Sequence, residues 1–476
     1  MAGMEGAGQA LYSASRLVIQ LRRRCPLVTQ LNERMIMKKI ALCFAALLAI
    51  LTGLWCLADN PMPAPLTYFS FRALYMQYSG IVAMGVMSVA MLLALRPKLV
   101  EPYLGGLDKM YRLHKWLGIT ALVTGLMHWW LGQGTKWMTQ WGWLIRPARG
   151  PRPNPGDLGW VEGWLRSQRG VAESVAEWAF YLALVLLVLA LVKHFPYRLF
   201  QKTHKWLAAS YLVFVYHTIV LTKFDYWGEP IGWLLAALVA GGSVAAVLTL
   251  LGRIGKHQKV GGVVESVHHY PALRVVEFGI VVQSGWAGHA AGQFAFVTTD
   301  RKEGAHPYTI ASAWDPSARR IVFFAKALGD HTRRLHEHLA TGMSVTVEGP
   351  YGCFDFRDDA IRQIWIAAGI GITPFIARMK ALAMEPGSKP IDLFHSTATC
   401  DADALGKLNA DAVAAGVRLH LIDSRKAGRL SSERIRRAVP EWASASVWYC
   451  GPPDFARALR QGFANQPFHQ ELFQMR

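Results

Sequence analysis

The stretch HKWLGITALVTGLMH, residues 114–128, begins and ends with histidine and contains a single charged residue, Lys115. A second stretch, HKWLAASYLVFVYH at residues 204–217, opens with the same four letters and also ends with histidine. At about 1.5 Å per residue, the two histidines of each stretch lie about 20 Å apart along a helix. The repeat therefore predicts two apolar helices that each carry one histidine near either end.

Both stretches belong to a series of apolar runs that are long enough to cross a bilayer, which takes about 20 residues. The six predicted spans cover residues 40–58, 73–95, 116–135, 174–192, 206–222 and 230–252. Lys and Arg are more numerous in the segments that face the cytosol if the N-terminus lies there. The positive-inside rule then places both termini in the cytosol and predicts a multi-pass protein of the bacterial inner (plasma) membrane.

The composition agrees with a membrane protein and excludes several other classes. Hydrophobic residues make up 52% of the 476 residues and charged residues 17%, which excludes intrinsic disorder. The six cysteines form no CxxC or CxxCH motif, which argues against a cysteine-ligated zinc or iron–sulfur site and a covalently bound haem. Basic residues at the inner membrane surface explain the net charge of +19, and we expect no nucleic-acid partner.

One loop, residues 132–172, is basic and rich in tryptophan although the rule places it outside. A loop anchored in the membrane interface by its tryptophans explains this composition, and attraction of an anionic electron acceptor by its arginines is the alternative. Residues 1–37 form a basic tail to which the sequence assigns no function.

The histidine positions predict a shared ligand. Because one span separates the two histidine-bearing helices, these helices run parallel. His114 then shares a depth with His204, and His128 shares one with His217. Neutral imidazole is an axial ligand of haem iron, so this arrangement predicts two stacked haems, each held by one histidine from each helix. Helix–helix hydrogen bonds or a proton relay are the alternative roles.

The second stretch departs from ideal geometry for such a site. Thirteen residues turn a helix to about 140° from the starting face. A wide turn or a bend is therefore expected between His204 and His217, or the two ligands are presented to opposite sides. The residues that could neutralise the propionates of the inner haem are Arg112, Lys115, Lys202 and Lys205. A basic flank that follows the positive-inside rule has the same composition.

From about residue 257 the pattern changes to short strands. A small antiparallel barrel is predicted from strands at 274–282, 293–299, 320–328 and 344–348, with Gly and Pro between them. A parallel sheet flanked by helices is predicted from strands at 364–368, 391–394, 417–422 and 446–450. Sheets of this second kind bind nucleotides at their carboxyl edge.

A glycine-rich motif, Gly369-Ile370-Gly371-Ile372-Thr373-Pro374, leaves a buried strand and enters a helix. Its glycines let the backbone approach a pyrophosphate, Thr373 could cap the helix, and Pro374 would occupy the first helical position. Taken alone this signal is weak, because many glycine-rich turns bind nothing.

A second motif, His306-Pro307-Tyr308-Thr309, ends a loop and starts a strand. Tyr308 could lie flat on a flavin ring, Thr309 could hydrogen-bond the reactive nitrogen of the flavin, and His306 could reach a phosphate. For an isolated motif of this kind, an ordinary strand start with a packed tyrosine is the preferred explanation.

The chain as a whole resembles the ferric reductase and NADPH oxidase family of transmembrane flavocytochromes. The resemblance covers roughly residues 70–476 and depends on the order of its motifs: the paired-histidine spans, HPYT, GPYG at 349–352, AAGIGITPF at 367–375 and CGP at 450–452. The second half is similar to the ferredoxin–NADP reductase superfamily. The resemblance implies a six-helix haem domain at 38–255, an FAD-binding β-barrel at 256–356 and an NAD(P)-binding α/β domain at 357–476.

The resemblance also implies cofactors and their contacts. The cofactors are FAD, two haem b groups and NAD(P)H. The implied haem ligands are His114, His128, His204 and His217. The implied FAD contacts are His306, Pro307, Tyr308, Thr309, Lys326, Gly329, Thr332 and, in the C-terminal tail, the aromatic Phe473. The implied NAD(P) contacts are Gly369, Ile370, Gly371, Ile372, Thr373, Pro374, Ser396, Arg425, Cys450, Gly451 and Pro452.

Two positions depart from relatives in this superfamily. Soluble relatives commonly have Arg where this chain has His306. Relatives that prefer NADPH often carry an Arg near position 398, where this chain has alanine. Ser396 and Arg425 could substitute for that Arg, so the choice between NADPH and NADH stays open.

The resemblance implies electron transfer from cytosolic NAD(P)H through FAD and two haems to an extracytoplasmic acceptor such as ferric iron. Alternatives are an oxidase that reduces oxygen to superoxide, a membrane-tethered flavin reductase without haem, and a transporter with a regulatory nucleotide-binding domain. No residue in the predicted external loops selects iron over oxygen.

Overall fold

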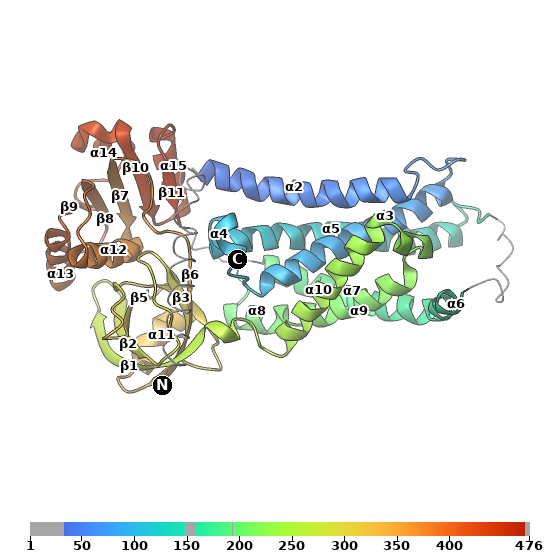
Figure 1. The fold of residues 1–476 in the computed structure, drawn as a ribbon, viewed down its shortest axis with the longest axis horizontal. Coiled ribbons are helices and arrows are strands. Elements are labelled where there is room, and N and C mark those ends of the chain that lie inside the picture. The colour runs from blue at the N-terminus through green and yellow to red at the C-terminus, as the bar shows by residue number, and fades with distance from the viewer. Residues whose placement is uncertain (1–32, 148–158, 193, 472–476) are drawn as a thin grey trace, which may run out of the picture.

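The computed structural model describes residues 33–147, 159–192 and 194–471. Long helices form a bundle at one end of the molecule, and two sheet domains lie at the other end (Figure 1). The bundle contains α2 (Glu33–Ala58), α3 (Tyr68–Ala94), α5 (Leu107–Gln140), α7 (Arg169–Leu191), α9 (Leu207–Leu221) and α10 (Pro230–Leu250). Shorter helices are α4 (Glu101–Leu104), α6 (Trp160–Ser167) and α8 (Tyr197–His204). Each predicted span therefore corresponds to one helix.

Four of these helices are long and apolar enough to cross a membrane: α2 from Lys38, α3, α7 and α10. The two helices that carry the paired histidines are not among them. Helix α9 has only 15 residues, and α5 includes Asp108, Lys109 and Arg112 in its first two turns. The structure supports a membrane-embedded bundle, whereas the count of six spans stays a prediction.

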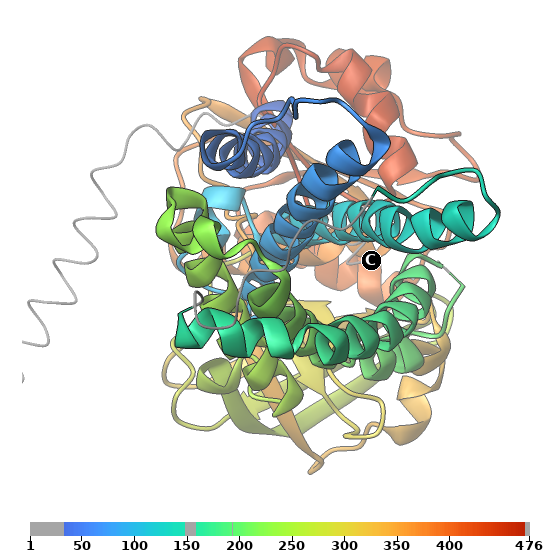
Figure 2. The ribbon, with the colours of Figure 1, turned by 90° about the vertical axis from the view of Figure 1, so that its right-hand side faces the viewer.

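Helix α3 lies at the centre of the bundle. It begins at a capping box in which Thr67 Oγ1 accepts a hydrogen bond from the Ser70 amide and Ser70 Oγ accepts one from the Thr67 amide. Val82 and Val86 of α3 pack with Leu117 of α5 in one hydrophobic cluster. Figure 2 looks along the bundle and shows α2 at its periphery.

The first sheet is antiparallel and six-stranded. Its strands are β1 (Lys259–Tyr270), β2 (Val275–Val282), β3 (Phe294–Thr298), β4 (His306–Thr309), β5 (Arg320–Lys326) and β6 (Ser344–Tyr351), in the order β4-β3-β6-β1-β2-β5. An isolated β-bridge between Ile310, just after β4, and Phe323 of β5 connects the two edge strands of this sheet. The predicted antiparallel domain is confirmed, and closure into a full barrel stays a prediction. Helix α11 (Asp330–His338) follows β5.

The second sheet is parallel, as predicted. Its strands are β7 (Arg362–Ala368), β8 (Ile391–Thr397), β9 (Arg418–Asp423), β10 (Ala445–Cys450) and β11 (Phe468–Gln470), in the order β11-β10-β7-β8-β9. The accompanying helices are α12 (Thr373–Met384), α13 (Ala402–Ala414), α14 (Ser432–Ala438) and α15 (Pro453–Gly462). Trp365, Phe375 and Trp448 are fully buried in its core.

The antiparallel sheet packs directly on the end of the bundle. Leu104 and Leu107 share one hydrophobic cluster with Phe294 and Tyr351 of the sheet. The amide of Gly352, in the GPYG motif, donates a hydrogen bond of 2.6 Å to the Glu101 carboxylate of α4. The motif therefore holds the two domains together at this point.

A buried ion pair crosses the same boundary. Arg96 Nη1, just after α3, lies 2.5 Å from Glu348 Oε1 of β6, and its guanidinium covers the Phe296 ring at 4.0 Å. The Tyr351 hydroxyl donates to the same carboxylate at 2.8 Å, and Lys259 lies 3.5 Å from its other oxygen. Glu348 is thus the common partner of groups from both domains.

Candidate functional site

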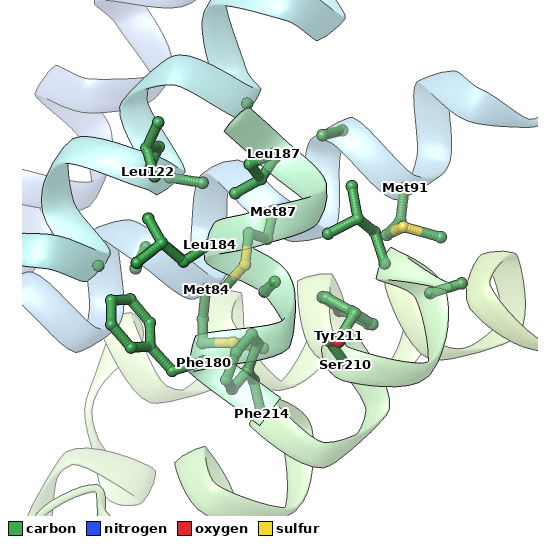
Figure 3. Close-up of a pocket in the computed structure, with 18 of the residues that line it drawn as sticks. Met84, Met87, Met91, Leu122, Phe180, Leu184, Leu187, Ser210, Tyr211 and Phe214 are labelled. Atoms are coloured by element: carbon green, nitrogen blue, oxygen red, sulfur yellow. The ribbon is translucent and has the colours of Figure 1, made fainter. Parts of the chain in front are cut away.

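The bundle surrounds a cavity of about 920 Å³. Residues of α3, α5, α7 and α9 line it, and at its inner end it reaches Phe296 and Ala305 of the antiparallel domain. Its middle section is apolar: Met84 and Met87 of α3 lie across from Leu184 of α7 and Phe214 of α9 (Figure 3). All four paired histidines line this cavity.

The histidines meet in two pairs across the cavity. The ring centres of His114 and His204 lie 6.0 Å apart with an angle of 63° between the planes. Those of His128 and His217 lie 6.1 Å apart at 77°. One pair is at the end of the bundle that faces the sheets, and the other is near the opposite end.

Three of the four histidines have a hydrogen-bond partner at Nδ1. His114 Nδ1 bonds the Ala90 carbonyl at 3.0 Å, and His217 Nδ1 bonds the Ala172 carbonyl at 3.1 Å. His128 Nδ1 lies 3.0 Å from Ser79 Oγ, which itself donates to the Tyr75 carbonyl at 2.6 Å and so accepts from the histidine. An acceptor at Nδ1 places the ring proton there and leaves the Nε2 lone pair free for a ligand.

His204 is the exception. Its Nδ1 is buried without a hydrogen-bond partner, and its ring stacks on Phe200 at 4.9 Å and 27°. His204 is also the last residue of α8, and α9 begins three residues later at Leu207. The expected bend between His204 and His217 is found at this break.

A row of glycines on α5 faces the cavity. Gly118, Gly125 and Gly132 are seven residues apart, which is close to two helical turns, so they lie on one face. A Cβ at Gly118 or Gly132 would meet no atom within 4 Å, and one at Gly80 of α3 would lie 3.5 Å from His128 Cε1. Sequence reasoning missed this row, although its seven-residue spacing was the available signal.

The HPYT motif forms β4, and α11 brings a second histidine to it. The rings of His306 and His331 stack at 3.9 Å and 4°, and the Nε2 atoms of both are buried without a partner. The Glu303 carboxylate lies within 4.8 Å of their ligand atoms and forms an ion pair with Arg198 at 3.3 Å. Burial, together with a smaller effect of His331, lowers the pKa of His306 to about 4, so His306 is neutral near pH 7.

Other predicted FAD contacts have additional local roles. Tyr308 packs edge-on against Phe278 in the hydrophobic core, with its hydroxyl buried and unpartnered, so its ring is not presented as an open surface in this structure. Pro307 and Thr309 lie beside it on β4, and Thr309 pairs with Phe294 of β3. Thr332 Oγ1 accepts hydrogen bonds from the amides of Leu328 and Gly329 and so closes its own loop. Phe473 lies outside the described residues.

The predicted NAD(P) contacts meet at the carboxyl edge of the parallel sheet. Gly369 follows β7, Ser396 is near the end of β8, Arg425 follows β9 and Cys450 ends β10. Gly369 has a φ of +56°, and a Cβ added there would lie 3.8 Å from Lys326 Nζ of the antiparallel sheet. The two predicted nucleotide-binding regions therefore face each other here.

One detail of the glycine-rich motif was predicted incorrectly. Thr373 is the first residue of α12 and does not cap it: its hydroxyl donates to the Ile370 carbonyl at 2.8 Å. Pro374 consequently occupies the second helical position. The reason is that Gly369–Ile372 wind into a 3-10 turn, which starts the helical backbone earlier than the sequence indicates.

Replacing Gly371 by alanine is expected to disrupt the nucleotide-binding edge. A Cβ at Gly371 would lie 2.1 Å from the Cys450 carbonyl oxygen, so β10 and the CGP turn must shift. We expect a loss of about 1–3 kcal/mol in the free energy of unfolding and a higher KM for NAD(P)H. Thermal unfolding and steady-state kinetics measure both effects.

Gly406→Ala is the matched control. Gly406 lies inside α13, and a Cβ there would meet no atom within 4 Å. That variant should be more stable by up to about 1 kcal/mol with an unchanged KM. Equal changes in stability and in KM for Gly371→Ala and Gly406→Ala would contradict the argument that a Cβ at Gly371 collides with β10.

Glu471, which follows β11, is buried with 5% of its surface exposed and with Oε2 unpartnered. Burial raises its pKa from 4.5 to about 8, and Asp108 of α5 adds to the rise. Between pH 4.5 and about 8 the folded protein therefore holds a proton on Glu471 that the unfolded chain has already released.

This proton makes stability depend on pH. As pH rises through that window, we expect the free energy of unfolding to fall by up to about 1.4 kcal/mol per pH unit and then to level off above the folded pKa. Glu471→Gln should remove this contribution, so thermal unfolding of the variant should change less with pH. An identical pH profile for the two proteins would show that Glu471 ionises normally.

Two regions of the chain match known protein families. Residues 79–215 match the ferric reductase like transmembrane component, and residues 274–354 match an FAD-binding domain. The first match contains His114, His128 and His204 and ends two residues before His217. The second contains the HPYT motif and β2 to β6.

Individual relatives match only part of the chain. An NADPH oxidoreductase of Mycobacterium tuberculosis is 32% identical over 152 residues, which are 30% of this chain and 39% of that protein. A stachydrine N-demethylase reductase subunit of Rhizobium meliloti is 27% identical over 224 residues, 42% of this chain and 63% of that protein. The chain spans less than two thirds of the length of these relatives.

Among solved structures, a cytochrome P450 reductase of Amycolatopsis aligns with a TM-score of 0.39 and 23% identity, over 45% of this chain and 69% of that one. The family matches carry the assignment. They show that the chain contains a region similar to the ferric reductase like transmembrane component, followed by a region similar to an FAD-binding domain.

Proposed function

We propose that this protein is a transmembrane oxidoreductase that passes electrons from cytosolic NAD(P)H, through FAD and two b-type haems, to an acceptor such as ferric iron on the other side of the membrane. The observation that carries the proposal is the pair of histidine contacts inside the bundle. The haems would supply one-electron transfer steps between FAD and the acceptor.

The spacing of the histidine rings fits a shared metal atom. An imidazole–metal bond is about 2.0 Å long, so two histidines on one metal have ring centres about 6 Å apart. The two pairs have ring centres 6.0 and 6.1 Å apart. A direct hydrogen bond between two imidazoles is not present in either pair among the described contacts, which disfavours a purely structural role.

The surroundings of the pairs fit a large flat group. The cavity is apolar in its middle section, and Gly118 of α5 leaves open space between His114 and His128. Lys115 and Lys205 line the cavity beside the inner pair and would neutralise acidic substituents there. We therefore assign His114 and His204 to the inner haem, and His128 and His217 to the outer haem.

The sheet domains would bind the electron donor and FAD. His306 and His331 offer two unpartnered ring nitrogens beside β4, and His306 could reach a phosphate of FAD. The carboxyl edge of the parallel sheet would bind NAD(P)H, with Gly369 and Gly371 allowing close approach of its phosphates. Lys326 reaches from the first sheet to the second and would bring the two ligands together.

The orientation of the chain follows from the same arrangement. NAD(P)H is cytosolic, so the end of the bundle that carries the sheets would face the cytosol. Helices α5 and α9 would then cross the membrane alongside α3, α7 and α10. Six spans with a cytosolic reductase half, beginning near residue 256, are part of this proposal.

A reduced-minus-oxidised absorption spectrum of the purified full chain tests the proposal. We expect b-type bands and two haems per chain by pyridine haemochrome assay. Absence of these bands would leave a membrane-anchored flavin reductase. In sealed vesicles supplied with NAD(P)H on the reductase side, ferrous iron formed on the opposite side would support a metal reductase, and superoxide would indicate an oxidase.

A further inference from the structure

Helix α8 joins the two redox regions by a row of aromatic rings. Tyr197, Phe200 and His204 lie three and four residues apart and therefore share one face of the helix. The Tyr197 and Phe200 rings are 6.2 Å apart at 27°, and the Phe200 and His204 rings are 4.9 Å apart at 27°. The row ends at a proposed ligand of the inner haem.

The other end of the row contacts the HPYT motif. The ring centres of Tyr197 and His306 lie 5.2 Å apart, and His306 in turn stacks on His331. The Tyr197 phenol is also close enough to Tyr308 to add to the rise that burial causes in the pKa of Tyr308. Tyr197 thus lies beside two proposed FAD contacts of β4.

Polar contacts hold α8 against the loop that precedes β4. Gln201 Nε2 donates to the Ala305 carbonyl at 3.1 Å, and Arg198 pairs with Glu303 at 3.3 Å. In Figure 1, α8 lies at the end of the bundle next to the antiparallel sheet. The helix is therefore positioned by the same loop that carries the flavin motif.

Phe200 also contacts the ring of His204 and limits its rotation. His204 is the paired histidine whose Nδ1 lacks an acceptor, so no hydrogen bond fixes the rotation of its ring. The stacked Phe200 ring restricts that rotation instead. Orientation of an axial imidazole is normally set by its second nitrogen, so Phe200 replaces that interaction at the inner site.

We propose that the aromatic face of α8, Tyr197 and Phe200, is the route by which electrons pass from FAD to the inner haem, and that Phe200 sets the orientation of His204. This inference rests on the proposed function. Each step moves one electron from reduced FAD to ferric haem iron, so FAD is oxidised and iron is reduced. No bond of the side chains forms or breaks, and the flavin proton is released to water after both electrons have left.

The test compares Phe200→Leu and Tyr197→Leu with Leu199→Ala in the full-length protein. Leu keeps an apolar side chain but removes the ring. Leu199 lies on the same helix, is 47% exposed and is outside the row, so it is the control. Stopped-flow spectroscopy after mixing with NAD(P)H follows flavin reduction and haem reduction separately.

In both variants that lack a ring, we expect NAD(P)H to reduce the flavin at the normal rate and the haem to be reduced about tenfold more slowly. The reason is that the packing of α8 between FAD and the inner haem is loosened, and electron transfer depends on that positioning. Leu199→Ala should behave as the unsubstituted protein. Phe200→Leu should also change the electron paramagnetic resonance spectrum of one oxidised haem, because the His204 ring is freed. Phe200→Tyr should restore both the rate and the spectrum.

Normal haem reduction in both Leu variants would overturn the route. An unchanged resonance spectrum in Phe200→Leu would overturn the orienting role. If Phe200→Leu loses the inner haem, the rate of haem reduction in Tyr197→Leu decides, because Tyr197 lies seven residues, about two helical turns, before His204. Absence of haem in the unsubstituted protein would instead remove the proposed function itself.

Discussion

His128→Ala is expected to remove one of the two haems and to stop electron transfer to the outer acceptor, while NAD(P)H still reduces FAD. His128 faces His217 across the cavity, and its Nδ1 bond to Ser79 orients it. Alanine has no ligand atom, so the outer site loses one axial bond. We expect transfer across the membrane to fall by about 100-fold or more, because even loss of a partner behind a ligand costs about 10–100-fold.

The haem content per chain and NAD(P)H-driven ferric reduction in vesicles measure this effect. His194→Ala is the control, since His194 is an exposed histidine outside the cavity. Direct reduction of a soluble dye by the flavin should be equal in both variants. An unaltered haem content in His128→Ala would contradict the assignment of this ligand.

Ser79→Ala should produce a milder form of the same defect. The substitution removes the oxygen that accepts from His128 Nδ1 but keeps the ligand. Haem should remain bound, with a shifted redox midpoint potential at one site. Redox titration followed by visible spectroscopy distinguishes the shifted site from the unshifted one.

Glu348→Ala is expected to separate the reductase half from the bundle and to destabilise the protein by about 3–5 kcal/mol. Glu348 is buried and bonded to Arg96 and Tyr351. Removing the carboxylate leaves the Arg96 guanidinium poorly compensated at a buried boundary, with its Nε already unpartnered. Loss of this contact also loosens β6, which continues into the Gly352 contact with Glu101.

Thermal unfolding and the rate of haem reduction by NAD(P)H measure the two consequences. Glu337→Ala is the control, because Glu337 pairs with Arg334 at the surface, where such pairs contribute about 0–1 kcal/mol. The double variant Arg96→Met with Glu348→Ala should recover part of the stability by removing the unpaired charge. A loss of stability no larger than that of the control would show that Glu348 does not hold the domains together.

The sequence predicted the helices and both sheets because their patterns are local. Each predicted span is a helix, since long apolar runs satisfy their backbone hydrogen bonds internally. Short alternating runs indicated β2, β3, β5 and β6. Strand β1 was missed, because two glycines and two histidines in it weaken the strand pattern, and its pairing with β2 and β6 supplies the missing stability.

The motifs were likewise visible in the sequence, but their packing was not. HPYT and the segment 326–332 are separated along the chain, and the stacking of His306 on His331 depends on how β4, β5 and α11 meet. The start of α12 at Thr373 depends on the 3-10 turn before it. Such details follow from contacts that a linear pattern does not contain.

By itself the sequence determined which histidines repeat and how many residues separate them, and helical rise converts that spacing into an approximate distance. Only the tertiary structure decided which rings face each other, that α8 breaks after His204, and that Phe200 rather than a hydrogen bond holds that ring. The physical reason is that ring contacts and the Arg96–Glu348 pair depend on packing between residues far apart in the chain.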